Sequence, residues 1–301
     1  GRAPDEVASG DVRGLTMRDF RHDHSALALN TATLGHNVPG VGAGWSPEQT
    51  IDACAERGIG GIVFWRREIE ERAAEIGDRA RQAGVKVVGL CRTPFLVGPL
   101  GLQSEEAILS DFRRSIDQTA ALGTDVLTIV VGGVETGTKG VTRSLDIVAD
   151  RMAKAIPYAE ACDVKLALEP LHPAYAGDRS CLTTTRDALD LCDLLASESV
   201  GVAIDIYHVW WDTDLPRQLA RAGNRILGFH LCDWLVPTTD ILLDRGMMGD
   251  GVADLRGIRR EVEAAGYSGF CEVEIFSANN WWKRHPADVL DTMVERFRTV
   301  C

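Results

Sequence analysis

The sequence predicts a single α/β domain with the (β/α)8 TIM barrel architecture. Eight short apolar segments alternate with eight amphipathic segments from residue 25 to the end of the 301-residue chain. The segment from residue 25 to residue 301 is close in length to typical (β/α)8 barrels, which have about 250 residues. No low-complexity linker divides the chain, and the first apolar segment is not followed by the G-x-G-x-x-G motif of dinucleotide-binding sheets. These observations favour a closed parallel barrel over an open doubly wound sheet.

The apolar segments have the composition of strands that are buried on both faces. We expect strands at residues 25–31, 60–65, 85–91, 125–131, 164–169, 200–206, 225–231 and 269–275. We expect helices at residues 46–57, 67–83, 103–122, 142–162, 183–196, 214–222, 254–265 and 286–299.

Capping residues mark several of the helix boundaries. Ser46 followed by Pro47 predicts an N-cap and a first helical residue, and Ser104, Thr185 and Asp254 predict further helix starts. Glycine precedes the next strand after many helices, as expected for helix C-termini, at Gly58, Gly84, Gly123, Gly223 and Gly266.

Composition and charge narrow the class of partner. The chain is 45% hydrophobic, which is enough for one large core. It carries 44 acidic and 32 basic residues, a formal net charge of −12. An acidic surface disfavours nucleic acid and anionic membranes as partners. The longest apolar segments are strand-length, far below the roughly 20 residues of a membrane-spanning helix.

The cysteines and the N-terminus predict a cytoplasmic protein. Eight cysteines are present, none in a C-x-x-C pair, and most lie in apolar segments, which is typical of reduced, buried thiols. Residues 1–24 are polar, without the apolar segment of a secretory signal. We therefore expect an N-terminal extension at residues 1–24 and a barrel at residues 25–301.

Four consecutive predicted strands carry, at or near their carboxyl ends, residues of the types that commonly bind metals. Glu169 ends the fifth strand, Asp205 the sixth, His230 lies in the seventh and Glu274 ends the eighth. Chemistry in (β/α)8 barrels is located at the carboxyl ends of the strands. Three carboxylates and an imidazole suit Mn²⁺, Mg²⁺, Co²⁺ or a similar ion, and would be unfavourable together without a cation. Each residue alone is more often structural, but the joint pattern predicts a metal site.

Glu272 is a fifth acidic residue near this set. It lies two residues before Glu274, on the same face of the strand but one layer deeper in the barrel. We expect it to support the site or to form a buried ion pair, and we prefer Glu274 as the ligand because it lies nearer the mouth.

These residues lie in five motifs of the second half of the chain: LALEPLHP, AIDIYHVWWD, GFHLCDW, DRGMMGDGVADL and GYSGFCEVEIF. In order and spacing the motifs resemble the xylose isomerase-like barrels of the sugar phosphate isomerase/epimerase superfamily, which includes ketose 3-epimerases, hydroxypyruvate isomerase and inosose dehydratase. The first half matches this family only in its alternation of strands and helices. The resemblance implies that His208 and Arg245 contact substrate. It also implies that the metal ligands are Glu169, Asp205, His230 and Glu274.

The chain departs from the ketose epimerases at three points. Met248 stands where a proline is usual after Arg245, residues 233–244 form a longer loop, and His172 replaces other residue types. The EPLHP segment and the tryptophan-rich loop after the sixth strand point toward relatives with bulkier substrates. These relatives are lyases and hydratases of 3-keto sugars and the large subunit of C-glycoside deglycosidases.

The resemblance also implies a mechanism. A divalent metal, with Mn²⁺ expected and Mg²⁺, Co²⁺ or Zn²⁺ as alternatives, would stabilise an enediolate formed by removing a proton next to the carbonyl of a keto sugar. Glu169 and Glu274 would move the proton on opposite faces of the substrate. His172 or His208 would protonate a leaving group in an elimination, or only orient a metal carboxylate.

Aromatic residues at the predicted mouth complete the candidate site. Trp65 ends the second strand, and Trp211 follows the sixth and could form a wall for a sugar face or pack against another subunit. For Trp65 and for Arg92, which follows the third strand, a surface or capping role is favoured for either residue alone.

The sequence thus predicts a metal-dependent sugar isomerase or epimerase. The alternative is a lyase or dehydratase acting on a 3-keto-glycoside, inosose or related keto-polyol, and a non-catalytic sugar-binding barrel is less favoured. An apurinic-site endonuclease shares the barrel but needs more metal ligands and a basic face. We expect a homo-oligomer, and whether a small accessory subunit is required stays open.

Overall fold

The eight predicted strands form one closed parallel barrel. The structure is a computed structural model that describes residues 17–301. The strand order is β1-β10-β7-β6-β5-β4-β3-β2. The barrel strands are β1 Leu27–Asn30, β2 Gly61–Trp65, β3 Lys86–Cys91, β4 Val126–Ile129, β5 Lys165–Leu168, β6 Val200–Asp205, β7 Ile226–Leu231 and β10 Cys271–Val273. The predicted (β/α)8 fold is confirmed, and each strand lies within the segment expected for it.

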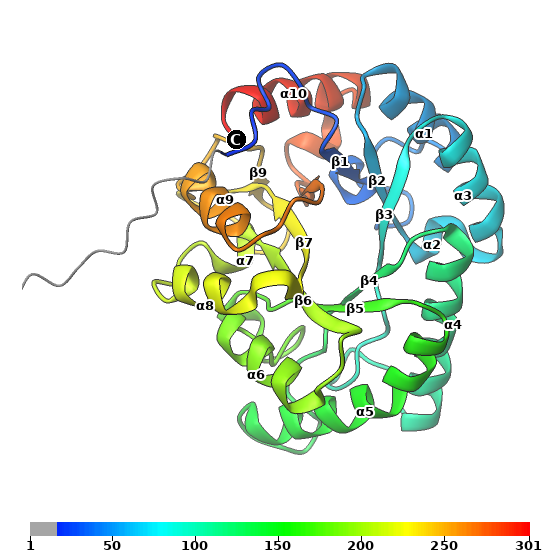
Figure 1. Cartoon of the computed structure of the whole chain (residues 1–301), viewed down its shortest axis with the longest axis vertical. Helices are drawn as coiled ribbons and strands as arrows, with labels where there is room; N and C mark the ends of the chain where they lie inside the picture. The colour runs from blue at the N-terminus through cyan, green and yellow to red at the C-terminus, as the bar shows by residue number, and fades with distance from the viewer. Residues whose placement is uncertain (1–16) are drawn as a thin grey trace, which may run out of the picture.

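Helices surround the ring of strands, as Figure 1 shows. They are α1 Pro47–Glu56, α2 Arg66–Ile69, α3 Ala73–Gln82, α4 Glu105–Leu122, α5 Thr142–Ala161, α6 Thr185–Leu195, α7 Ile206–Val209, α8 Leu215–Ala222, α9 Leu255–Ala264 and α10 Pro286–Thr299. The prediction of one helix over residues 67–83 was wrong. Glu70 has a φ of 39°, outside the helical range, and it separates α2 from α3.

The predicted helix starts are largely confirmed. The Ser46 hydroxyl accepts a hydrogen bond from the Gln49 backbone N–H, and the Gln49 side chain accepts one from the Ser46 backbone N–H. Ser104 and Asp254 also cap their helices. The cap of α6 is Thr184, one residue before the predicted Thr185.

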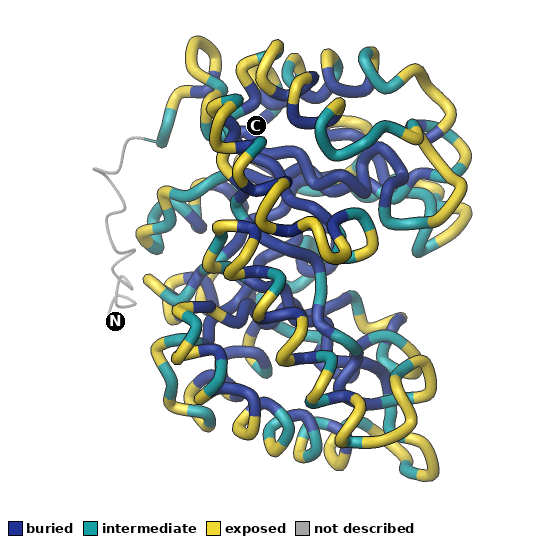
Figure 2. The backbone as a smooth tube through the Cα atoms, turned by 90° about the vertical axis from the view of Figure 1, so that its right-hand side faces the viewer, coloured by how far each residue is buried: buried dark blue, intermediate teal, exposed yellow. Residues whose placement is uncertain are grey.

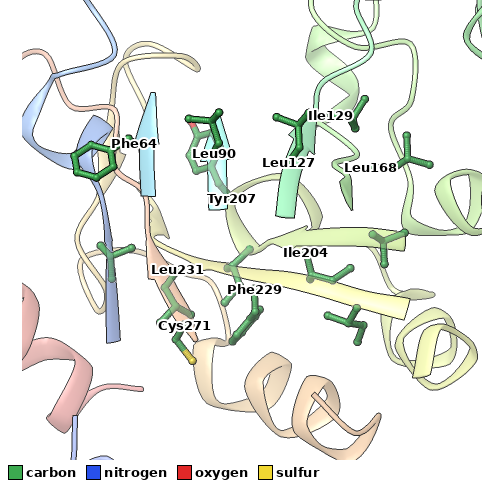
Figure 3. Packing of buried hydrophobic residues seen from close by; sticks show 14 of the residues in the cluster. Phe64, Leu90, Leu127, Ile129, Leu168, Ile204, Tyr207, Phe229, Leu231 and Cys271 are labelled. Atoms are coloured by element: carbon green, nitrogen blue, oxygen red, sulfur yellow. The ribbon is translucent and has the colours of Figure 1, made fainter. Parts of the chain in front are cut away.

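Alternate residues of each strand face opposite sides of the barrel wall. Leu90, Leu127, Leu168, Ile204 and Phe229 come from five strands and belong to the main hydrophobic cluster, which also includes residues of the surrounding helices. Figure 3 shows these five side chains on their strands. The intervening residues of the strands face the barrel interior, where Gly89, Ala167, Ala203 and Gly228 line a small cavity together with His230 and Glu272. This alternation assigns the polar residues at the strand ends to the interior.

The end of the predicted N-terminal extension packs against the barrel. Phe20 is buried, stacks on Phe297 at a centroid distance of 4.2 Å, and lies under the Arg259 guanidinium. The first 16 residues of that predicted extension lie outside the described part of the chain. Figure 2 shows the buried backbone of the strands inside a shell of exposed outer turns.

Two short elements that the sequence did not predict shape the loop after β7. Strands β8 (Asp233–Trp234) and β9 (Arg245–Gly246) form a two-stranded antiparallel sheet. The buried Asp233 carboxylate accepts hydrogen bonds from the backbone N–H groups of Trp234, Gly249 and Ala253. These bonds fix the GMMGDG segment and therefore the backbone of Arg245.

The structure agrees with the predictions of reduced, buried cysteines and of apolar segments too short to span a membrane. All eight cysteines are free thiols, and seven of them are buried. Within residues 17–301, no helix has the length and apolar character needed to span a bilayer.

Candidate metal centre and its cavity

The barrel brings the four predicted metal ligands together. Asp205 and His230 are paired across β6 and β7, and the backbone N–H groups of Glu169 and Glu274 continue the ladders one residue past β5 and β10. One ligand atom from each of the four side chains lies within 4.8 Å of the other three, and all four residues are buried. The spacing suits a single cation held between the four groups.

Glu272 and Glu169 fix the orientation of the His230 ring. The ring Nδ1 lies 3.0 Å from Glu169 Oε1, and Nε2 lies 3.2 Å from Glu272 Oε2. Nε2–H can therefore donate to Glu272 while Nδ1 faces the ligand cluster. A carboxylate that accepts from the second ring nitrogen is a common support for a metal-binding histidine. Glu272 therefore contacts the His230 ring directly, a geometry compatible with both roles that the sequence left open, a support for the site and a buried ion pair.

Asn30 connects Glu272 and Glu274 to the mouth of the barrel. Its amide nitrogen donates to Glu272 Oε1 at 2.7 Å and to Glu274 Oε1 at 3.1 Å. Its carbonyl oxygen accepts from Trp65 Nε1 at 2.8 Å. Cys91, Glu272 and Glu274 also lie close enough to hold an ion. The Asn30 amide nitrogen lies within hydrogen-bond distance of all three of these side chains. The space between Cys91, Glu272 and Glu274 is therefore already occupied by a hydrogen-bond donor.

The electrostatics of the cluster fit a divalent cation. Burial raises the pKa of Glu169, and burial together with the Glu169 charge raises the pKa of Glu274 well above its ordinary value. Burial alone would lower the pKa of His230, but the Glu272 and Glu169 carboxylates raise it well above its ordinary value. Charges crowded in a buried site are stabilised when a cation binds between them.

Arg245 supplies one positive charge beside this cluster. Its Nη1 donates to Asp205 Oδ2 at 3.1 Å and lies 3.4 Å from Glu274 Oε2. The guanidinium lies between the Tyr207 and Phe276 rings, 4.4 Å and 4.3 Å from their centroids. Burial alone would raise the pKa of Asp205, but Arg245 holds it below its ordinary value. Arg245 is therefore fixed in place before any substrate binds.

His208 is a neutral, buried side chain. Its Nδ1 accepts a hydrogen bond from the His172 backbone N–H at 3.1 Å, which assigns the ring proton to Nε2. Nε2 lies 3.6 Å from Asp205 Oδ2 and 3.3 Å from Arg245 Nη2. Burial lowers the pKa of His208 to about 3. At neutral pH this histidine can position substrate or a carboxylate without carrying charge.

A cavity of about 250 Å³ opens above the ligands. Its lining includes the predicted residues Glu169, Glu274, His208, Arg245 and Trp65. Its volume lies just below the range of small-molecule pockets, about 300–1,000 Å³. The cavity therefore suits a sugar-sized compound better than a bulky glycoside.

His172 and Trp211 do not line this cavity. His172 caps a short 3-10 helix (η3, Pro173–Tyr175), and its ring stacks on Trp234 at a centroid distance of 4.9 Å. Trp211 follows α7, donates its indole N–H to the His208 carbonyl and contacts the His172 ring edge-on. The turn of α7 carries the tryptophan away from the mouth, into an aromatic cluster.

Several lining residues were not among the predicted site residues. They are Phe95, Tyr175, Arg179 and Phe276, together with Arg92, for which the sequence favoured another role. Phe276 lies two residues after Glu274, so strand alternation could have identified it. Tyr175 and Arg179 lie in the long loop after β5, where no periodic pattern predicts side-chain position.

The chain matches the family model for the xylose isomerase-like TIM barrel over residues 51–300. This match covers most of the chain, so the protein belongs to that family. No curated protein sequence matches it.

Solved structures show the same barrel. The protein SMc04130 of Sinorhizobium meliloti is 47% identical, with a TM-score of 0.85 over 92% of this chain and 98% of that one. The IolI protein with a bound zinc atom is 20% identical, with a TM-score of 0.74 over 89% of this chain and 95% of that one. The 3-keto-D-glucoside 4-epimerase YcjR of E. coli is 17% identical, with a TM-score of 0.65 over 89% of this chain and 97% of that one. The last two likenesses concern the fold alone.

Proposed function

We propose that this protein is a divalent-metal-dependent enzyme that removes a proton from the carbon next to the carbonyl of a sugar-sized keto compound, as an isomerase or epimerase does. The observation that carries the proposal is the convergence of Glu169, Asp205, His230 and Glu274 within 4.8 Å of one another at the base of a small cavity. Family membership supports it, as do fold relatives that include an epimerase.

The four ligands would hold the cation, with Mn²⁺ as our first choice and Mg²⁺, Co²⁺ or Zn²⁺ as alternatives. When bound, such an ion withdraws electron density from a substrate carbonyl oxygen and makes the adjacent carbon more acidic. The zinc atom bound to the IolI protein is compatible with this range of metals.

Glu169 and Glu274 are the groups that we assign to proton transfer. Their side chains line the cavity, whereas Asp205 and His230 are not part of its lining. Burial raises the pKa of both carboxyls, which strengthens them as bases. They project from β5 and β10, which are separated by β6 and β7, so they can approach a bound substrate from different sides.

Arg245 and His208 would orient the substrate, and aromatic residues would limit the access of water. Trp65, Phe95 and Phe276 contribute apolar surface around the two carboxylates. The small volume and the position of His172 outside the lining favour isomerisation or epimerisation over an elimination in which His172 is the acid. The lyase and dehydratase activities remain the alternative.

Solvent deuterium exchange tests this proposal. Metal-loaded protein in D₂O would be incubated with D-fructose, D-psicose, a 3-keto-glucoside, an inosose, a hexuronate and a ketose phosphate, and loss of the proton next to the carbonyl would be followed by NMR. We expect exchange on at least one compound, slowed by roughly 10²-fold or more in Glu169→Gln and Glu274→Gln. The exposed Glu198→Gln variant is the matched control. Absence of exchange on the whole panel, or equal rates in both cavity variants, would contradict the proposal.

A further inference from the structure

Two arginines in the cavity have no carboxylate partner. Arg92 follows β3, Arg179 lies in the loop after η3, and both line the cavity that contains Glu169 and Glu274. Among residues 17–301, no aspartate or glutamate side chain forms an ion pair with either guanidinium. The third arginine of the lining, Arg245, differs because Asp205 and Glu274 neutralise it.

Arg92 is largely removed from solvent in spite of its charge. Its guanidinium lies 4.0 Å from the centroid of the Phe95 ring, and within residues 17–301 its side chain donates one hydrogen bond, to the Thr93 carbonyl at 3.3 Å. Burial, together with the smaller effect of the nearby positive charges of Arg179 and Arg66, lowers the pKa of Arg92 to about 10. A desolvated cation of this kind is unfavourable unless an anion binds beside it.

Arg179 adds a second positive charge at the same wall. Its guanidinium forms no hydrogen bond with another side chain or carbonyl of the described residues, and it is close enough to Arg92 for their like charges to interact. The protein has more acidic than basic residues, 44 against 32. A general shortage of carboxylates therefore does not explain the unpaired charges.

We propose that Arg92 and Arg179 form a binding site for an oxyanion, so that the substrate is a keto compound bearing a carboxylate or phosphate group. The inference rests on the proposed function for the position of the carbonyl, at the Glu169 and Glu274 end of the cavity. The anionic group would lie at the arginine end. Guanidinium groups are well suited to this role because their N–H donors match the oxygens of both anions.

The site also contributes to substrate selection. A neutral ketose would leave two partly buried guanidinium groups without an anion, whereas a keto acid or a sugar phosphate would pair with them. Sites with unpaired polar groups discriminate strongly against ligands that lack the matching group.

Binding of simple anions tests the inference without turnover. Inorganic phosphate and acetate would be titrated separately into metal-loaded protein by calorimetry, at low ionic strength. The variants are Arg92→Gln, Arg179→Gln and, as a matched control, Arg260→Gln, an exposed arginine on α9 outside the cavity lining. We expect binding of at least one anion, weakened by about tenfold or more in each cavity variant and unchanged in the control. Circular dichroism would verify that each variant is folded.

The outcomes separate this inference from the proposed function. Binding of phosphate alone would indicate a phosphorylated substrate, and binding of acetate would indicate a carboxylate. If neither anion binds, or if both cavity variants bind like the wild type, the anion site is refuted, whatever the exchange experiment shows. If the anion binds at the arginines but no compound exchanges deuterium, the anion site stands and the proposed proton abstraction fails.

Discussion

Replacement of Glu272 by glutamine tests how the barrel prepares His230 for metal binding. The Glu272 carboxylate accepts from two donors at once, His230 Nε2–H at 3.2 Å and the Asn30 amide at 2.7 Å. A glutamine of the same shape offers one acceptor oxygen and one NH₂ group. One of the two donors must then face an NH₂ group, or the His230 proton must move to Nδ1, the nitrogen beside Glu169 that is needed for the metal.

The expected loss follows from these contacts. A buried donor without an acceptor costs about 1–3 kcal/mol. Loss of a supporting hydrogen bond to a metal-binding histidine typically weakens the metal affinity by about 10–100-fold. That range corresponds to about 1.4–2.8 kcal/mol, so the two estimates agree. We therefore expect Glu272→Gln to bind Mn²⁺ or Zn²⁺ about 10–100-fold more weakly than the wild type.

Competition with a chromophoric chelator at fixed pH would measure this difference. Glu198→Gln makes the same chemical change at an exposed position and should keep the wild-type affinity. If Glu272→Gln is folded and binds metal as tightly as the wild type, the carboxylate does not orient His230 and the reasoning is refuted.

Two further predictions concern the same buried network. Asn30→Asp would place another carboxylate against Glu272 and Glu274, so we expect the metal-free protein to lose roughly 3–5 kcal/mol of stability, measured by denaturant unfolding. A stability equal to that of the wild type would show that the Asn30 amide is not needed there. Metal affinity should rise with pH, because His230 has a raised pKa and must release a proton from Nδ1 before it binds the ion. The pH range below that raised pKa includes the ordinary histidine range near 6.5. In this range the metal affinity should rise about tenfold per pH unit for each proton released. A metal affinity that does not change with pH in chelator competition would exclude this proton release.

The sequence was sufficient to predict the fold and the convergence of the four side chains that we propose as metal ligands. Strand alternation assigns Glu169, Asp205, His230 and Glu274 to the barrel interior, and the parallel topology brings all strand ends to one face. Both arguments use periodicity and connectivity, which the sequence displays directly.

The cavity wall could not be predicted in the same way. Arg179 reaches the cavity because of the path of the loop after β5, and Trp211 leaves it because α7 turns the chain. Such paths depend on tertiary contacts, including the hydrogen bonds of Tyr175 and Tyr207 to the Ile241 carbonyl. No local sequence pattern encodes contacts between residues so far apart in the chain.

The most direct test of the account is the metal content of the purified protein after incubation with Mn²⁺ and removal of free ions. We predict about one divalent ion per chain. The ion should be lost in Asp205→Asn and His230→Gln and retained in Glu198→Gln. Protein that holds no divalent ion, or that keeps its full content in both ligand variants, would contradict the assignment of these four residues as a metal centre.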